Sequence, residues 1–234
     1  MTKTLVITGA SKGIGRAAAQ RFRDNRFRVV NISRSECPLD GITQINADMS
    51  QPDWLQSCGD DIRAAVGDSA HITLIHNACR HEKDTIAQLD AAVFQQTLQV
   101  NLIAPSQLNQ LLLPLMAPGS SILYLGSTLS EKAVAGSCSY VVSKHAIVGM
   151  MRATCQDLAG TGVHTVCLCP GFTDTQMLRA HVGDSPEVLQ QIAAGVTFGR
   201  LIEPGEIART LHFCAEQPVL NGAVIHANLG QIEH

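Results

Sequence analysis

The segment TLVITGASKGIG, residues 4–15, decides the fold of this chain. Residues 4–8 are apolar or β-branched, which is typical of a strand buried on both faces. A turn containing Gly9, Gly13 and Gly15 follows, and residues 16–22 then contain strong helix formers and no breaker. Strand, glycine turn and helix start predict a cradle for a diphosphate, because glycine allows close backbone approach and the helix N-terminus attracts negative charge. The spacing is T-G-x-x-x-G-x-G rather than the general G-x-G-x-x-G.

Further strand candidates recur along the chain and are separated by stretches with helical patterns, without a linker or repeat. This alternation predicts an α/β fold with a doubly wound parallel sheet, Rossmann-like, of about seven strands with helices on both faces. We expect residues 1–234 to form a single dinucleotide-binding and catalytic domain. The further strand candidates are residues 27–32, 42–47, 71–75, 121–125, 163–169 and 223–227.

Composition argues against several classes of partner. The formal net charge is −3, so no basic field indicates nucleic acid or an anionic membrane. No apolar run approaches the ~18 residues of a spanning helix, and the early first strand leaves no room for a signal peptide, so we expect a cytoplasmic protein. The eight cysteines form no C-x-x-C pair and the histidines no H-x-x-x-H, which indicates packed thiols and no metal site.

Tyr140 and Lys144 are one helical turn apart, and Ser127 lies upstream of them. A tyrosine has a pKa near ~10 and carries protons poorly at neutral pH unless a cation stabilises its phenolate. Residues i and i+4 share a helix face, with Cβ atoms roughly 5–6 Å apart, so Lys144 is placed to be that cation. The pair alone also fits an ordinary solvated helix. The glycine turn of residues 9–15 favours the catalytic interpretation.

The chain resembles the short-chain dehydrogenase/reductase family, specifically its single-domain branch, and is similar in layout to the 3-oxoacyl-acyl-carrier-protein reductases. The resemblance covers essentially the whole chain, and the motifs occur in the family's order and spacing. The matching segments are the cofactor turn at residues 8–15, the acidic segment at 46–49, the segment at 76–79 that is usually Asn-Asn-Ala-Gly, and the nicotinamide segment at 170–175.

The resemblance implies a catalytic tetrad of Asn101, Ser127, Tyr140 and Lys144. In carbonyl reduction, Ser127 is expected to hydrogen-bond the substrate oxygen and Tyr140 to give it a proton as general acid, while the nicotinamide delivers hydride to the carbon. Lys144 is expected to lower the pKa of Tyr140 and to bind the nicotinamide ribose. Asn101 is expected to hold a water that passes protons toward Lys144.

The expected cofactor is NADP(H), with NAD(H) as the less favoured alternative. Enzymes that prefer NAD usually place a carboxylate at the end of the second strand, whereas a 2′-phosphate is attracted by cations. Here that position is neutral Ser33, followed by Arg34, and Lys12 is directed to the same region in the family; Glu36 is close enough to act in the opposite sense. The expected cofactor-binding residues are Gly9, Ser11, Lys12, Gly13, Ile14, Gly15, Ser33, Arg34, Asp48, Asn77, Ala78, Tyr140, Lys144, Pro170, Gly171, Thr173 and Thr175.

The expected function is NADPH-dependent reduction of a ketone, of 3-oxoacyl type or another small carbonyl, to a secondary alcohol. Two alternatives stay open: an NAD-dependent dehydrogenase of secondary alcohols or sugars, and a redox-sensing dinucleotide binder that has lost turnover. The expected substrate is a small molecule. Use of an acyl carrier protein is doubtful, because the segments 116–121 and 158–162 contain no cation to attract an acidic partner.

Other segments bear on assembly and on substrate choice. Residues 91–116 and 140–159 are apolar on more than one side, which indicates packing against another subunit in a homotetramer or homodimer. The polar segment 176–200 is expected to form a lid that selects substrate. The chain departs from the family at His76 and Cys79, and at residues 228–230, where Asn-Leu-Gly replaces the common Asp-Gly-Gly.

Overall fold

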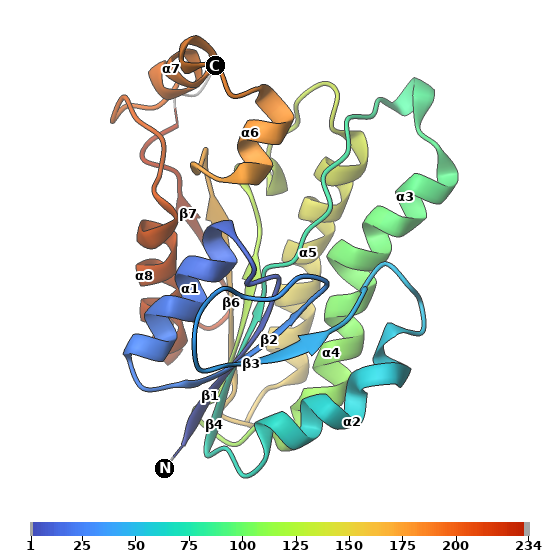
Figure 1. The fold of residues 1–234 in the computed structure, drawn as a ribbon, viewed down its shortest axis with the longest axis vertical. Helices are drawn as coiled ribbons and strands as arrows, with labels where there is room; N and C mark the ends of the chain where they lie inside the picture. Colours follow the sequence, from blue (N-terminus) through green and yellow to red (C-terminus); the bar gives the residue numbers. More distant parts are fainter. Residues whose placement is uncertain (1, 232–234) are drawn as a thin grey trace.

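A computed structural model of the chain describes residues 2–231. Its centre is a seven-stranded parallel sheet in the order β3-β2-β1-β4-β5-β6-β7. Helices cover both faces of this sheet (Figure 1), so the predicted doubly wound α/β fold is confirmed. The strands are β1 (Lys3–Thr8), β2 (Arg28–Ser33), β3 (Ile42–Asn46), β4 (His71–His76), β5 (Ser121–Leu125), β6 (His164–Pro170) and β7 (Ala223–Ala227).

Two layers of helices bury the two faces of the sheet. Helices α1 and α8 pack against each other and share one apolar cluster with the sheet, while α2, α4 and α5 share the other cluster. The central strands β1, β4, β5 and β6 are almost entirely buried, as their continuous apolar runs predict. The helices are α1 (Gly13–Asp24), α2 (Trp54–Val66), α3 (Ala91–Leu98), α4 (Ala104–Leu112), α5 (Cys138–Asp157), α6 (Gln176–Val182), α7 (Pro186–Ala194) and α8 (Pro204–Ala215).

Short turns complete the architecture. Single 3-10 turns occur at Ile86–Gln88, Leu113–Leu115, Thr128–Ser130 and Pro218–Leu220. Helices α6 and α7 follow β6 and lie beyond one end of the sheet, at the top of the view in Figure 1. Within residues 2–231, no helix is both long and apolar enough to cross a lipid bilayer.

The long stretch 91–116 is not one continuous helix. Between α3 and α4 the backbone widens into a π-helical turn at Gln99–Ile103. Pro105 explains the irregularity, because it has no N–H to donate to the carbonyl of Asn101 and its ring crowds that carbonyl in a regular α-helix. A widened turn of this kind is often found at functional sites. Here it places Asn101 in the protein interior.

Candidate active site

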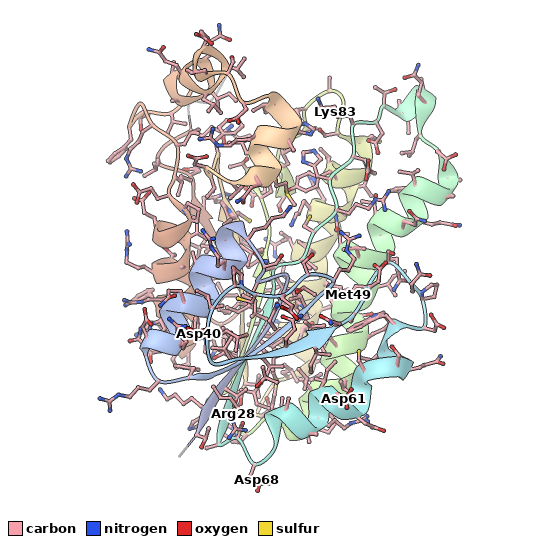
Figure 2. The ribbon with its side chains drawn as sticks, in the orientation of Figure 1. Arg28, Asp40, Met49, Asp61, Asp68 and Lys83 are labelled. Carbon is pink, nitrogen blue, oxygen red and sulfur yellow. The ribbon has the colours of Figure 1, made fainter. Side chains whose placement is uncertain are left out.

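A cavity of about 820 Å³ lies where the parallel strands end. The order of the sheet reverses between β1 and β4, and ligands of such sheets bind outside the carboxyl ends of the strands at this switch point. The lining includes Gly9 after β1 and Asn77 after β4. Figure 2 shows Lys83 at the same end of the molecule as α6, whereas Arg28 and Asp68 mark the opposite end.

The glycine turn is shaped for close approach of a ligand and of its own backbone. Gly9 and Gly13 have φ of +74° and +56°, a region that side chains rarely adopt. A Cβ at Gly15 would lie 2.2 Å from the carbonyl oxygen of Gly9, so Gly15 lets the helix pack under the turn. The helix α1 then begins at Gly13 with no acidic residue in its first turn. The turn therefore suits a diphosphate, which is stabilised by free N–H groups at a helix N-terminus.

Residues from neighbouring strands hold this turn in place. The Asn31 side chain on β2 accepts a hydrogen bond from the N–H of Ala10 at 2.8 Å. The Asn77 amide donates to the carbonyls of Thr8 and Gly9, both at 2.9 Å, and the Thr8 hydroxyl accepts from the N–H of Asn77 at 3.0 Å. The cradle is thus assembled from β1, β2 and β4 together.

The end of the cavity near β2 and β3 is lined by Ser33, Arg34 and Asp48. Arg34 is exposed. Partial burial opposes ionisation of Asp48, but hydrogen bonds from Ser50 and the charge of Arg34 keep the pKa of its carboxyl below the ordinary value. This end therefore offers one carboxylate and one exposed cation to a ligand. Lys12, also exposed, lines the cavity nearby in the glycine turn.

At the other end, Ser127, Tyr140 and Lys144 come together. Ser127 follows β5 by two residues and caps the turn at Thr128–Ser130, while Tyr140 and Lys144 lie on α5. The Ser127 hydroxyl is hydrogen-bonded to Tyr140. The Lys144 ammonium lies 5.4 Å from the centre of the Tyr140 ring and donates to the carbonyl of Leu125 at 2.7 Å. The helical spacing therefore places lysine beside tyrosine as expected.

The pKa values of this pair have opposing causes. Burial raises the pKa of Tyr140, and the opposing effects of Lys144 and of the Ser127 hydrogen bond are smaller. The expectation that Lys144 lowers the pKa of Tyr140 thus holds for its own contribution but not for the net shift. Burial opposes the charge on Lys144, yet Cys79 and Tyr140 raise its pKa above the ordinary value. At neutral pH the structure therefore presents a protonated tyrosine next to an ammonium.

The segment that enters α6 forms the remaining wall. Pro170, Gly171, Thr173 and Thr175 all line the cavity. The Thr175 hydroxyl caps α6 by accepting from a backbone N–H at 3.2 Å, and the Thr173 hydroxyl donates to the carbonyl of Gly171 at 3.1 Å. From the expected lid, residues of α6 line the cavity and those of α7 do not.

Two of the expected site residues lie outside the cavity lining, Gly15 and Asn101. Asn101 stands behind the wall, where its side-chain oxygen accepts from the N–H of Arg80 at 2.7 Å. Its amide group donates to the carbonyl of Arg80 and to the Ser143 hydroxyl, both at 2.9 Å. The side chain of Asn101 therefore holds the loop after β4. The other expected site residues, named from the sequence above, all line the cavity.

The loop after β4 also brings residues that the sequence pattern did not single out. Arg80, His81 and Glu82 line the cavity, as do Ser137 before Tyr140 and His181 on α6. Arg80 is paired with Glu82, their nearest charged atoms 2.8 Å apart. One signal was available: a segment that leaves a central strand at its carboxyl end faces the switch point, so the residues after Ala78 belong to the site.

Within residues 2–231, the cysteines and acidic residues form no group that could hold a metal ion. All eight cysteines are free thiols, and the sulfurs of Cys167 and Cys169 are 3.9 Å apart on one face of β6, as their spacing predicts. In the part of the chain that the structure describes, no three metal-ligating side chains are grouped to hold an ion.

A glycine-turn cradle at a switch point, joined to a Ser, Tyr and Lys cluster, defines a dinucleotide-dependent oxidoreductase acting on carbonyl or alcohol groups. The family comparison narrows this class: residues 3–185 match the family described as short chain dehydrogenase. The chain belongs to this family, whose members bind NAD(H) or NADP(H).

Three comparisons illustrate its relatives. The chain is 27% identical to the chloroplastic NADPH-dependent aldehyde reductase 2 of Arabidopsis thaliana, over 97% of this chain and 93% of the relative. It is 26% identical to the 3-oxoacyl-[acyl-carrier-protein] reductase FabG of Salmonella typhimurium, over 97% and 96%. The ligand-free aldohexose dehydrogenase of Thermoplasma acidophilum superposes with a TM-score of 0.89 at 25% identity, over 98% of this chain and 94% of that one.

Proposed function

We propose that this protein reduces a small ketone, of 3-oxoacyl type or another carbonyl, to a secondary alcohol with NADPH. The observation that carries the proposal is the position of Tyr140, hydrogen-bonded to Ser127 and adjacent to Lys144, at one end of the cavity whose other end holds the glycine turn. The relatives named as an NADPH-dependent aldehyde reductase and a 3-oxoacyl reductase support reduction.

Each residue of the cluster has a separate task in this reaction. NADPH, when bound, supplies the hydride that goes to the carbonyl carbon. The hydroxyls of Ser127 and Tyr140 hold the substrate oxygen, and Tyr140 transfers its proton to that oxygen. Lys144 then stabilises the phenolate of Tyr140, because its ammonium lies beside the ring.

Reprotonation of Tyr140 needs a path from solvent. The side-chain amide of Asn101 is hydrogen-bonded to Arg80 and Ser143. The backbone carbonyl of Asn101 has no α-helical hydrogen bond, because residue 105, which would donate it, is a proline without an N–H. We therefore place the water of the proton relay at this carbonyl oxygen rather than at the side chain. Lys144 passes the proton on to Tyr140.

The proposed preference for NADPH rests on Arg34 and Lys12, which line the same end of the cavity while Glu36 is not among its lining residues. A charge-assisted hydrogen bond to a 2′-phosphate contributes roughly 1.5–3 kcal/mol, so Arg34→Ala should weaken NADPH binding about tenfold or more and change NADH binding little. Fluorescence titration of both nucleotides tests this. Equal affinity of the wild type for NADPH and NADH contradicts the preference.

The reaction itself is tested by spectrophotometric turnover of NADPH with ketones, β-ketoesters and acyl thioesters. Tyr140→Phe keeps the ring and removes the proton donor, so turnover should fall by about 10²–10⁴. Dinucleotide binding should persist in this variant. A Tyr140→Phe protein with wild-type turnover on an accepted substrate rules out Tyr140 as the general acid.

A second candidate is an NAD-dependent dehydrogenase of secondary alcohols or sugars, which the similarity to the aldohexose dehydrogenase favours. The same assay run with NAD and alcohols decides between the two directions. A dinucleotide sensor without turnover is disfavoured, because Ser127, Tyr140 and Lys144 are positioned together.

We also propose that the protein is a cytoplasmic homotetramer or homodimer. Ile103 and Val142 are large apolar residues that remain 43% and 42% exposed on the α4 and α5 side of the molecule. The free thiols are consistent with a reducing compartment. Light scattering after size-exclusion chromatography tests the assembly, and a monomer at micromolar concentration contradicts it.

A further inference from the structure

Three rings are stacked at the substrate end of the cavity. The imidazole of His81 lies on the ring of Tyr140, with centroids 4.0 Å apart and planes inclined by 22°. His181 of α6 lies on His81, with centroids 3.9 Å apart and planes inclined by 20°. Two rings cannot occupy the same face of one imidazole, so His81 is enclosed between Tyr140 and the expected lid.

His81 is held firmly in this position. Its Nε2 is 3.1 Å from the Ser137 hydroxyl. On one side of it, Asn101 binds both the N–H and the C=O of Arg80. On the other side, the backbone of Asp84 pairs with the start of α5. The segment that carries His81 is therefore fixed at both ends, and the imidazole cannot leave without breaking these contacts.

The wall of the same cavity also has an apolar and more exposed part. Leu129, Val134 and Met177 line it with apolar side chains. Val134 is 52% exposed and Met177 is 41% exposed, so both have room to move. A methionine adapts easily to different apolar shapes, because its side chain is unbranched and flexible. The cavity wall thus combines a rigid ring stack with a more adaptable apolar part.

We propose that His81, supported by His181, determines specificity by restricting the substituent on its side of the carbonyl carbon to hydrogen or methyl. The substrates are then aldehydes and methyl ketones, with the larger substituent directed away from the ring stack. This inference rests on the proposed function, since it takes Tyr140 as the proton donor to the carbonyl oxygen.

The restriction is one of size rather than of charge. Burial, followed by the charges of His181 and Lys144, lowers the pKa of His81 to about 4. Burial likewise lowers the pKa of His181. Both rings are therefore neutral at neutral pH. A neutral wall neither attracts nor repels an ionised substrate strongly, but it occupies space next to Tyr140.

Two isomeric ketones measure this restriction directly. 2-Octanone and 4-octanone have the same composition, but the smaller substituent is methyl in the first and propyl in the second. In the wild type, kcat/KM should strongly favour 2-octanone. His81→Ala should shift the ratio toward 4-octanone by about tenfold or more, since one methylene in a tight pocket changes kcat/KM by roughly 10–200-fold. His81→Phe is the matched control, because it keeps a ring in the stack and should keep the ratio near the wild-type value.

A second readout uses one substrate only. Fixed positions for methyl and hexyl groups give mainly one enantiomer of 2-octanol, and His81→Ala should erode this excess. His181→Ala removes only the outer ring and should shift both readouts in the same direction by less. If His81→Ala does not fold, His181→Ala decides the question, with NADPH binding as the check on folding.

The outcomes separate the two levels of the proposal. Unchanged ratios and enantiomer excess in the alanine variants overturn the role of His81 and leave the proposed reduction standing. The same conclusion follows if His81→Phe shifts the ratio as far as His81→Ala does. A wild-type protein that binds NADPH but reduces no aldehyde or ketone overturns the proposed function, and the inference with it.

Discussion

The role of Asn101 can be measured by removing its side chain. Asn101 is buried, and its amide makes three hydrogen bonds: two with the backbone of Arg80 and one with Ser143. Each such bond contributes about 1 kcal/mol net, and a buried backbone group left without a partner costs more. Asn101→Ala should therefore lower the free energy of unfolding by about 3 kcal/mol.

Urea unfolding followed by circular dichroism gives this difference directly. Asn46→Ala is the matched control, because Asn46 is an exposed asparagine at the end of β3, and its loss should change stability by about 0.5 kcal/mol or less. Since Asn101 lies outside the cavity lining, dinucleotide affinity should change little while kcat/KM falls as the loop of His81 loosens. Equal stability of the Asn101→Ala and Asn46→Ala proteins would refute the structural role assigned here.

Three further predictions concern pH and partner. Burial, opposed by the Asn109 hydrogen bond, lowers the pKa of His76 to about 4. The imidazole therefore binds a proton more readily in the unfolded chain than in the folded one. The free energy of unfolding should fall by about 2 kcal/mol between pH 6.5 and 5. Urea unfolding at both pH values should give a shallower slope for His76→Asn, and equal slopes contradict the assignment. Because burial raises the pKa of Tyr140, the rate of carbonyl reduction should be constant across neutral pH and decline only at alkaline pH, where the rate of alcohol oxidation should rise. A reduction rate that rises and an oxidation rate that falls at alkaline pH exclude Tyr140 as the proton carrier. A 3-oxoacyl group on a small thiol should be reduced at least as well as on a carrier protein, since residues 116–121 and 158–162 contain no cation; a large, salt-sensitive preference for the carrier protein would disprove this.

Most of the fold could be predicted from local patterns in the sequence. The bounds of β5 and β7 match the apolar runs in the sequence, and each of the other strands differs by one residue at one or both ends. The i, i+4 spacing was sufficient to place Lys144 beside Tyr140, because both lie within one regular helix. These features depend on neighbours in the sequence, which is why they could be predicted.

Features that depend on distant contacts could not be predicted in this way. The stack of His81 and His181 joins residues from a loop and a helix that no local pattern connects. Gly15 was expected to contact the cofactor, but its position is explained by the carbonyl of Gly9 above it. The net pKa shift of Tyr140 depends on burial, which exceeds the effect of Lys144 that the spacing indicated.

The π turn at residues 99–103 lies between these two cases. In the sequence, residues 91–116 form one long stretch that is apolar on more than one side. Pro105 was a local sign of a break, since a proline inside a helix removes a hydrogen bond and crowds the preceding turn. The direction in which Asn101 then points, toward Arg80, required the packed structure.

The hydrogen bonds from Asn77 to Thr8 and Gly9 span 69 and 68 residues of the chain. During synthesis, the glycine turn emerges early but has no Asn77 to close it until β4 has joined β1. Nucleotide affinity is therefore acquired only after this long-range pairing. Such pairing is among the slower steps of folding, because the entropy cost of closing the loop comes before the stabilising contacts form. A nucleotide added during refolding selects chains that have completed the first half of the sheet. Once the nucleotide concentration exceeds Kd, the free energy by which it stabilises these chains increases with the logarithm of that concentration.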